Sequence, residues 1–239
     1  MNQPDQLEQV RAALDTVTDP EIDESVTALE FVSSVEVSDD NDVSIEFRLP
    51  TYWCAPNFAF MMASDMRDSV AEIDWVRSVS IKLLDHFSAD LINRGVALKQ
   101  DFRDAFPGET DDDLASVRLK FLGKAFERRQ ELLIRHLLGM GYKGEWMTRI
   151  SLRELMGLSL DYEGTRLLTL YIFAWRRLHP EWSEANLAFV ALSGDRLDPG
   201  QLPSYLRKIG GVRRNAEYNG LICRSLLAER KAEMAGARE

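Results

Sequence analysis

The residue best suited to chemistry is Cys54, which lies in a short loop, Pro50 to Pro56, between a predicted strand and a predicted helix. A helix start offers unpaired backbone N–H groups and the positive end of the helix dipole, and both favour a thiolate. The thiolate is the form of cysteine that attacks electrophiles and binds metal ions. Asp19 and Glu21 follow the first predicted helix and would add carboxylate ligands if that loop lies near Cys54. The alternative is that Cys54 is buried and inert, and that Asp19 only caps a turn.

The remaining reactive side chains form no recognisable motif. His86, His136 and His179 are far apart in the sequence. His136 lies in an apolar helical segment, where a structural role is the simpler interpretation. Cys223 lies among leucine and isoleucine residues and is interpreted as a small buried hydrophobic residue. The sequence has no glycine-rich nucleotide loop, no Cys-x-x-Cys pair and no histidine-rich metal motif.

The elements that must position Cys54 follow the order helix, strand, strand, helix, strand. The predicted elements are a helix over residues 3–17, strands over 26–37 and 43–49, a helix over 58–73 and a strand over 75–84. Pro20 ends the first helix. The two strands form a hairpin, because turn residues separate them and the second strand alternates strictly between apolar and polar side chains. We expect a small α-β-β-α-β domain over residues 1–95.

From residue 96 to residue 239 the pattern predicts a helical domain, so the expected fold class is α+β. Two capping boxes, Thr110 with Asp113 and Ser151 with Glu154, mark helix starts. The longer predicted helices cover residues 114–137, 163–178, 184–192, 199–210 and 213–234. The helix over 163–178 is nearly all apolar from Leu167 to Trp175, which predicts burial on most of its sides. Gly210 and Gly211 are expected to separate the last two helices.

Charge is distributed unevenly along the chain. Residues 1–90 hold 19 acidic and 5 basic side chains, a net charge of −14, and residues 91–239 hold 20 and 24, a net charge of +4. The acidic part should repel nucleic acids and anionic membranes, so neither is expected as a partner. Only two cysteines occur, and the N-terminal residues lack a signal-peptide pattern. These features predict a cytoplasmic protein with reduced thiols.

Together these N-terminal features resemble the SufT/PaaD-like family of iron–sulfur, or metal–sulfur, cluster assembly proteins. The resemblance rests on the Asp19-Pro20-Glu21-Ile22 segment, the hairpin, the junction of strand, Cys54, Pro56 and helix, and the third strand. Family members tend to have glycine before the cysteine and proline directly after it, where this chain has Trp53 and Ala55. The resemblance implies that Cys54 is the functional, metal-contacting residue, with Asp19 and Glu21 as further cofactor-binding residues.

Three functions are compatible with these features. The first is a maturation factor, not an enzyme, that assists iron–sulfur or non-haem iron centre assembly in a client metalloprotein such as a multicomponent oxygenase. It would hold iron or a cluster transiently and no cofactor permanently. Since a cluster needs about four ligands, Cys54 would require a homodimer, a partner's ligands or acidic co-ligands. The second is an adaptor or folding chaperone without metal. The third, an enzyme with Cys54 as nucleophile, ranks last because no histidine lies near Cys54 in the sequence.

Overall fold

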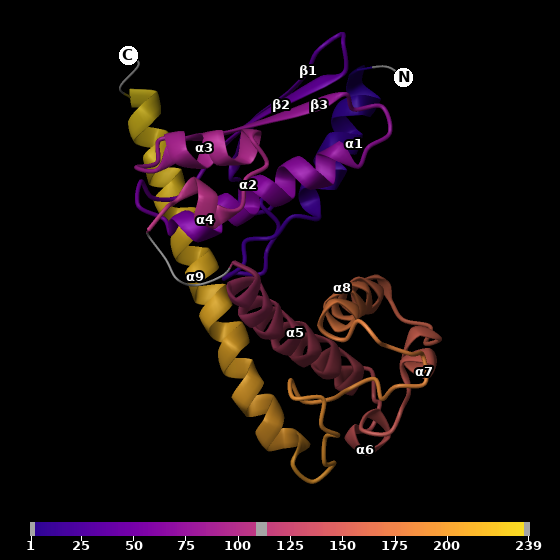
Figure 1. The fold of residues 1–239 in the computed structure, drawn as a ribbon. Helices are drawn as coiled ribbons and strands as arrows, with labels where there is room; N and C mark the ends of the chain where they lie inside the picture. The colour runs from indigo at the N-terminus through magenta and orange to yellow at the C-terminus, as the bar shows by residue number, and fades with distance from the viewer. Residues whose placement is uncertain (1–2, 109–113, 237–239) are drawn as a thin grey trace. The chain divides into compact units, whose positions relative to one another are not determined.

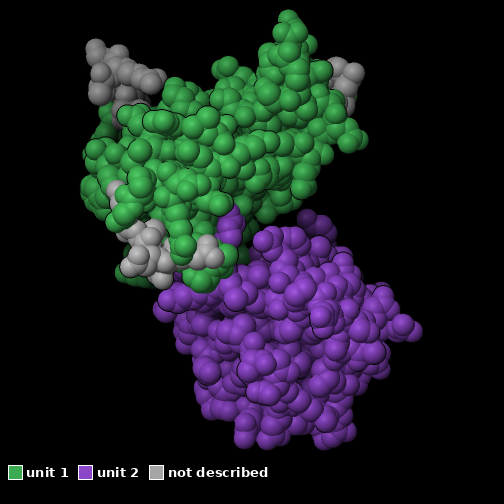
Figure 2. Space-filling view, in the orientation of Figure 1, with its two compact units in different colours: residues 1–117, 217–239 green, residues 118–216 purple. Residues whose placement is uncertain are grey.

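The computed structural model describes residues 3–108 and 114–236. Two compact units make up the chain: unit 1 holds residues 1–117 together with 217–239, and unit 2 holds residues 118–216 (Figure 2). Unit 1 contains the sheet, and the C-terminal region is predominantly helical. The fold class is therefore α+β, as predicted.

Unit 1 is built on a three-stranded sheet (Figure 1). Its strands, in sheet order, are β1 (Val32–Val37), β2 (Asp42–Arg48) and β3 (Ser78–Leu84). β1 and β2 form the predicted antiparallel hairpin, and Asn41 makes the turn with a φ of 64°, a conformation that asparagine tolerates. β3 is parallel to β2, which requires a crossover, and α2 (Pro56–Ala71) supplies it.

The core of unit 1 lies between the sheet and its helices. Val43, Ile45 and Phe47 of β2 are buried and the side chains between them are not, so the alternation in the sequence correctly identified the core face. α1 (Gln3–Asp15) and α2 lie on one side of the sheet (Figure 1). The order α-β-β-α-β is thus confirmed.

Two predicted strands begin later than expected. The first was expected from residue 26 and begins at Val32, because residues 25–31 use their backbone hydrogen bonds in tight turns. In that segment the N–H of Leu29 donates to the Ser25 carbonyl, and Glu30 has a φ of 58°. β3 begins at Ser78 and not at residue 75, because the preceding residues form the turn that follows α2.

The division into units differs from the predicted boundary at residue 95. α3 (Ala89–Ala97) and α4 (Phe102–Ala105) belong to unit 1, since α3 packs on β3 and α2. Phe102 and Phe106 lie edge-on to Phe60 of α2, with ring centroids 5.5 and 6.5 Å away. These rings extend the core beyond the sheet, so the chain remains in unit 1 past residue 95.

The last helix, α9 (Leu202–Gly236), is continuous, and the predicted break at Gly210 and Gly211 is wrong. Glycine in a helix interior costs only about 1 kcal/mol relative to alanine, which surrounding contacts can offset. At position 210 the small residue is needed, because a Cβ there would stand 3.0 Å from Oε1 of the fully buried Glu131. That carboxylate also accepts a hydrogen bond from Nε of Arg213 at 2.8 Å. Residues 217–236 of the helix belong to unit 1.

Unit 2 surrounds its own apolar core. Its helices are most of α5 (Leu114–Gly139), α6 (Gly144–Met147), α7 (Leu152–Met156), α8 (Tyr162–Leu178) and the first part of α9. The Ser151 and Glu154 capping box is confirmed, because the Ser151 side chain accepts from the Glu154 N–H and the Glu154 carboxylate accepts from the Ser151 N–H. The predicted box at Thr110 and Asp113 lies outside the described residues.

Two helix predictions in unit 2 are wrong in detail. Residues 184–192 form no helix, because their backbone groups pair elsewhere: the Ala188 N–H donates to the Ile150 carbonyl, and the Ala188 carbonyl accepts from Tyr171. α8 is buried on one face only, and Phe173, inside its apolar run, is exposed. Within the described residues, none of the helices is both long and apolar enough to cross a membrane.

Removing the Tyr171 hydroxyl should weaken unit 2. This hydroxyl is fully buried, donates to the Ala188 carbonyl at 2.7 Å and accepts from Nε2 of Gln130 at 3.0 Å. Tyr171→Phe leaves both groups short of a partner, so we expect α8 amides to lose about 1–3 kcal/mol of opening free energy in hydrogen exchange. Tyr162→Phe removes an exposed hydroxyl from the same helix and should change it by less than about 0.5 kcal/mol. Equal protection in both variants would contradict this.

Candidate functional site

Cys54 lies where it was predicted, in the loop between β2 and α2. Pro56 is the first residue of α2, a position where its fixed φ suits the helix and its missing N–H is not needed. The Cys54 side chain is half-buried, and its Sγ lies 3.1 Å from Oγ1 of Thr51. The thiol therefore has one polar contact and remains partly accessible.

His86 holds the Cys54 loop through the backbone. Its Nε2 lies 2.7 Å from the Cys54 carbonyl oxygen, and its Nδ1 accepts the Ser88 N–H at 3.1 Å, which assigns the proton to Nε2. Burial is the main effect on His86 and lowers its pKa. The hydrogen bond with the Cys54 carbonyl opposes this shift, and the charge of Arg230 adds to it. Both ring nitrogens are engaged with backbone groups, so His86 positions the loop and neither nitrogen is available to the Cys54 thiol.

Asp19 organises the loop that follows α1. Its Oδ1 accepts the N–H groups of Glu21 and Ile22, each at 2.9 Å, and only 8% of the residue is exposed. Burial raises the pKa of Asp19 to about 6, with smaller contributions from the charges of Glu21 and Asp23, while the two backbone hydrogen bonds lower it. Asp19 thus shapes a turn, as one interpretation of the sequence had it. A metal-binding role for Asp19 and Glu21 stays a prediction.

The structure adds Cys223, which the sequence had suggested was a buried hydrophobic residue. Cys223 lies on α9 and is only half-buried. Burial raises the pKa of its thiol to about 11, and the negative charges of Asp19, Cys54 and Glu21 contribute in that order, with Arg224 opposing them. A Cβ at Gly220 would stand 3.1 Å from Cγ2 of Ile22, and Arg224 donates to Glu24, so this part of α9 lies against the loop that holds Asp19 and Glu21. No short sequence motif joins Cys223 to Cys54, because the two residues lie far apart along the chain.

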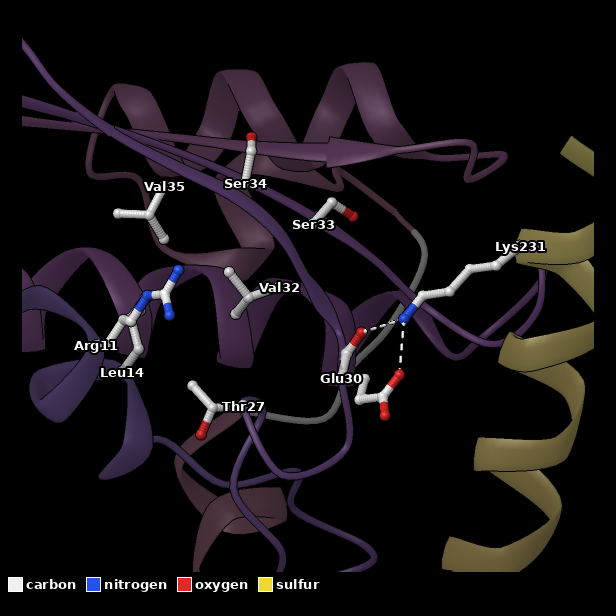
Figure 3. A pocket seen from close by; sticks show the side chains of 9 residues that line it. All are labelled: Arg11, Leu14, Thr27, Glu30, Val32, Ser33, Ser34, Val35 and Lys231. Atoms are coloured by element: carbon white, nitrogen blue, oxygen red, sulfur yellow. Dashed lines mark hydrogen bonds and ion pairs between the residues drawn. The ribbon is translucent and has the colours of Figure 1, made fainter. Parts of the chain in front are cut away.

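α9 reaches this neighbourhood through several polar contacts with unit 1. Arg230 Nη1 donates to the Leu49 carbonyl at 2.9 Å, just beyond the end of β2, and its other terminal nitrogen donates to the Asp85 carbonyl. Lys231 Nζ lies 3.0 Å from Oε2 of Glu30, a pair that borders a surface groove beside β1 (Figure 3). The helix is thereby fastened to the chain segments after β2, after β3 and before β1.

Exposed aromatic side chains border Cys54. Trp53 is 73% exposed, and Tyr52 and Phe87 are about half exposed. The rings of Tyr52 and Phe87 lie 6.1 Å apart, and Phe87 stacks on His86 at 4.8 Å. Exposed aromatic groups next to a reactive group are typical of surfaces that bind another protein.

Within the part of the chain that the structure describes, the side chains form no closed set of metal ligands. Among residues 3–108 and 114–236, no group of three or more histidine, cysteine, aspartate or glutamate side chains is arranged to hold a metal ion. The sequence-based expectation that Cys54 cannot hold a cluster unaided stays a prediction.

Residues 7–83 match the family described as iron-sulfur cluster assembly protein. The N-terminal region of the chain is a domain of this iron–sulfur assembly family, as its sequence features had indicated. The matched region contains Asp19, Glu21 and Cys54 and ends within β3. It excludes Cys223 and all of unit 2. Neither curated proteins nor solved structures gave a match.

Proposed function

We propose that unit 1 contacts iron or sulfide transiently through Cys54 during assembly of a metal centre in a client protein. The family match supports a general role in iron–sulfur assembly. The observation that carries the finer proposal is the position of Cys54, the only cysteine in the matched region. It is half-buried, lies just before the N-terminus of α2 and has Thr51 as its polar neighbour. A thiol in that position is accessible enough to exchange a ligand with another protein.

On this proposal the protein is a maturation factor and not an enzyme, and it keeps no cofactor permanently. The scarcity of ligands among the described residues supports transient contact over storage. The engagement of both His86 nitrogens supports the same view, because a nucleophilic Cys54 would need a base. The competing proposal is an adaptor or chaperone that binds its client without metal, for which the exposed Trp53, Tyr52 and Phe87 would suffice.

We further propose that the client is a metalloprotein of a multicomponent oxygenase system. The support is the resemblance to the PaaD-like branch and the contrast between an acidic N-terminal part and a basic remainder, which would steer encounter with a client of matching charge. Co-expression tests it. Omitting this protein should lower the iron content and the activity of a candidate oxygenase, and full iron loading without it would leave a general iron–sulfur role.

Cys54→Ser tests the central proposal. The substitution is nearly isosteric and should change stability by less than about 1 kcal/mol, yet it removes the thiolate. After anaerobic reconstitution with ferrous iron and sulfide, transfer to an apo-ferredoxin should be lost. The control is Ala55→Ser, which changes the adjacent exposed residue and should transfer like the wild type. Transfer by the Cys54→Ser variant at the wild-type rate would favour the adaptor.

A further inference from the structure

The part of α9 that belongs to unit 1, residues 217–236, turns one face toward the rest of that unit. Its contacts recur at intervals of three or four residues, which is the spacing of a single helix face. At the near end, a Cβ at position 220 would stand 3.1 Å from Cγ2 of Ile22, and Arg224 Nη1 donates to Oε2 of Glu24 at 2.6 Å. Farther along the helix, Leu227 is buried. Arg230 then donates to the carbonyls of Leu49 and Asp85, and Lys231 donates to Glu30.

Cys223 stands on this face, between the two ends of the contact. It is three residues after Gly220 and four before Leu227, so its side chain belongs to the same stripe. The near end of the stripe meets the loop of Asp19, and the far end meets the chain at Leu49, from which the Cys54 loop continues. Cys223 and Cys54 also pack against the same hydrophobic core. Two independent sets of contacts therefore bring the two cysteines to one end of unit 1.

We propose that Cys223 is the second thiolate of the site and that Cys54 and Cys223 together bind one thiophilic metal ion. The inference rests on the proposed function, which makes ferrous iron the cargo. Thiolates are the preferred ligands of iron in sulfur-rich sites. The two sulfurs leave the remaining coordination positions open, because no group of three or more histidine, cysteine, aspartate or glutamate side chains within residues 3–108 and 114–236 is arranged to hold a metal ion. Sulfide, a small thiol or a client's cysteine would fill those positions, as a carrier requires.

The local charge fits a cation. Asp19 and Glu21 act on Cys223 with negative charge, and Arg224 is the opposing group. A cation bound between the sulfurs would offset the same negative charges.

Anaerobic titration with Co²⁺ tests the proposal on the full chain. Co²⁺ substitutes for ferrous iron, and its bonds to thiolates give a charge-transfer band whose intensity follows the number of sulfurs. We expect the band in the wild type, about half of it in Cys54→Ser and in Cys223→Ser, and none in the double variant. Each single variant should bind at least about tenfold more weakly, since even loss of an outer-shell partner weakens metal binding by roughly 10–100-fold.

The matched control is Ile222→Ser, which places the same side chain one residue away on an exposed part of α9 and should leave the band unchanged. A full band in Cys223→Ser together with its loss in Cys54→Ser would overturn the inference and leave the proposed function standing. A band that falls in each single variant and vanishes in the double variant, in a protein that transfers nothing to a client, would support the two-sulfur site and reject the proposed function. A wild type without any band would contradict the two-sulfur site.

A second measurement uses the unmodified chain. Dibromobimane becomes fluorescent when two neighbouring thiols displace both of its bromides and are joined by the bimane group. The wild type, which has only Cys54 and Cys223, should give one fluorescent intramolecular cross-link that mass spectrometry assigns to this pair. Labelling of each cysteine singly, without a cross-link, would show that the two sulfurs do not meet.

Discussion

Replacing Leu227 by alanine should destabilise unit 1 by about 2–5 kcal/mol, the range for truncating a buried leucine. Leu227 is 2% exposed and belongs to the same hydrophobic core as the strands, although it comes from the far end of the chain. The substitution leaves a cavity between α9 and that core. Because the neighbouring contacts of Arg224 and Arg230 are polar and partly exposed, they offset little of the loss.

Hydrogen exchange measures this effect unit by unit. Amides of β2 should lose protection in Leu227→Ala, and amides of α8 in unit 2 should serve as the internal reference. Leu221→Ala is the matched control, since Leu221 is on the same helix, belongs to unit 1 and is 62% exposed. We expect it to change the opening free energy by less than about 0.5 kcal/mol. Unchanged protection of β2 in Leu227→Ala would mean that α9 is not part of this core.

Local patterns were sufficient for the elements around Cys54. The alternation through Val43, Ile45 and Phe47 identified β2 and its core face, and Pro56 marked the start of α2. Local sequence patterns do not predict a segment whose conformation depends on contacts with residues far away along the chain. α9 continues through Gly210, where buried Glu131 occupies the space that a side chain would need, and no window of local sequence contains both residues.

The same distinction applies to the site. Asp19, Glu21 and Cys54 lie in the matched family region, where their spacing along the chain is informative. His86 and Cys223 join them through tertiary contacts: His86 by its bond to the Cys54 carbonyl, and Cys223 by the packing of α9. Cys223 also lies among apolar neighbours, and that composition is equally typical of a buried structural cysteine. One available signal was the recurrence of residues 220, 223, 224 and 227 on a single helix face.

Asp19→Asn is expected to change how the stability of unit 1 depends on pH. The pKa of Asp19 is about 6 in the folded protein, against 3.8 for an ordinary aspartate, so between these values the folded state binds more protons than the unfolded state. Stability contributed by protonated Asp19 is therefore present below pH 4 and is lost as the pH rises through 6. The difference of about two pKa units corresponds to on the order of 3 kcal/mol. Asparagine keeps an oxygen for the N–H groups of Glu21 and Ile22 but carries no charge to bury.

The stability of the Asp19→Asn variant relative to the wild type should accordingly rise by on the order of 3 kcal/mol between pH 4 and pH 7.5. The measurement is the opening free energy of β2 amides at each pH, corrected for the intrinsic exchange rate. Taking the difference between variant and wild type cancels the titration of the other carboxylates. Glu8→Gln removes the same charge from an exposed position of α1 and is the matched control. A flat difference for Asp19→Asn would show that this carboxylate is well solvated in the folded state. In that case its oxygens would be more accessible to a metal than its burial in the turn implies.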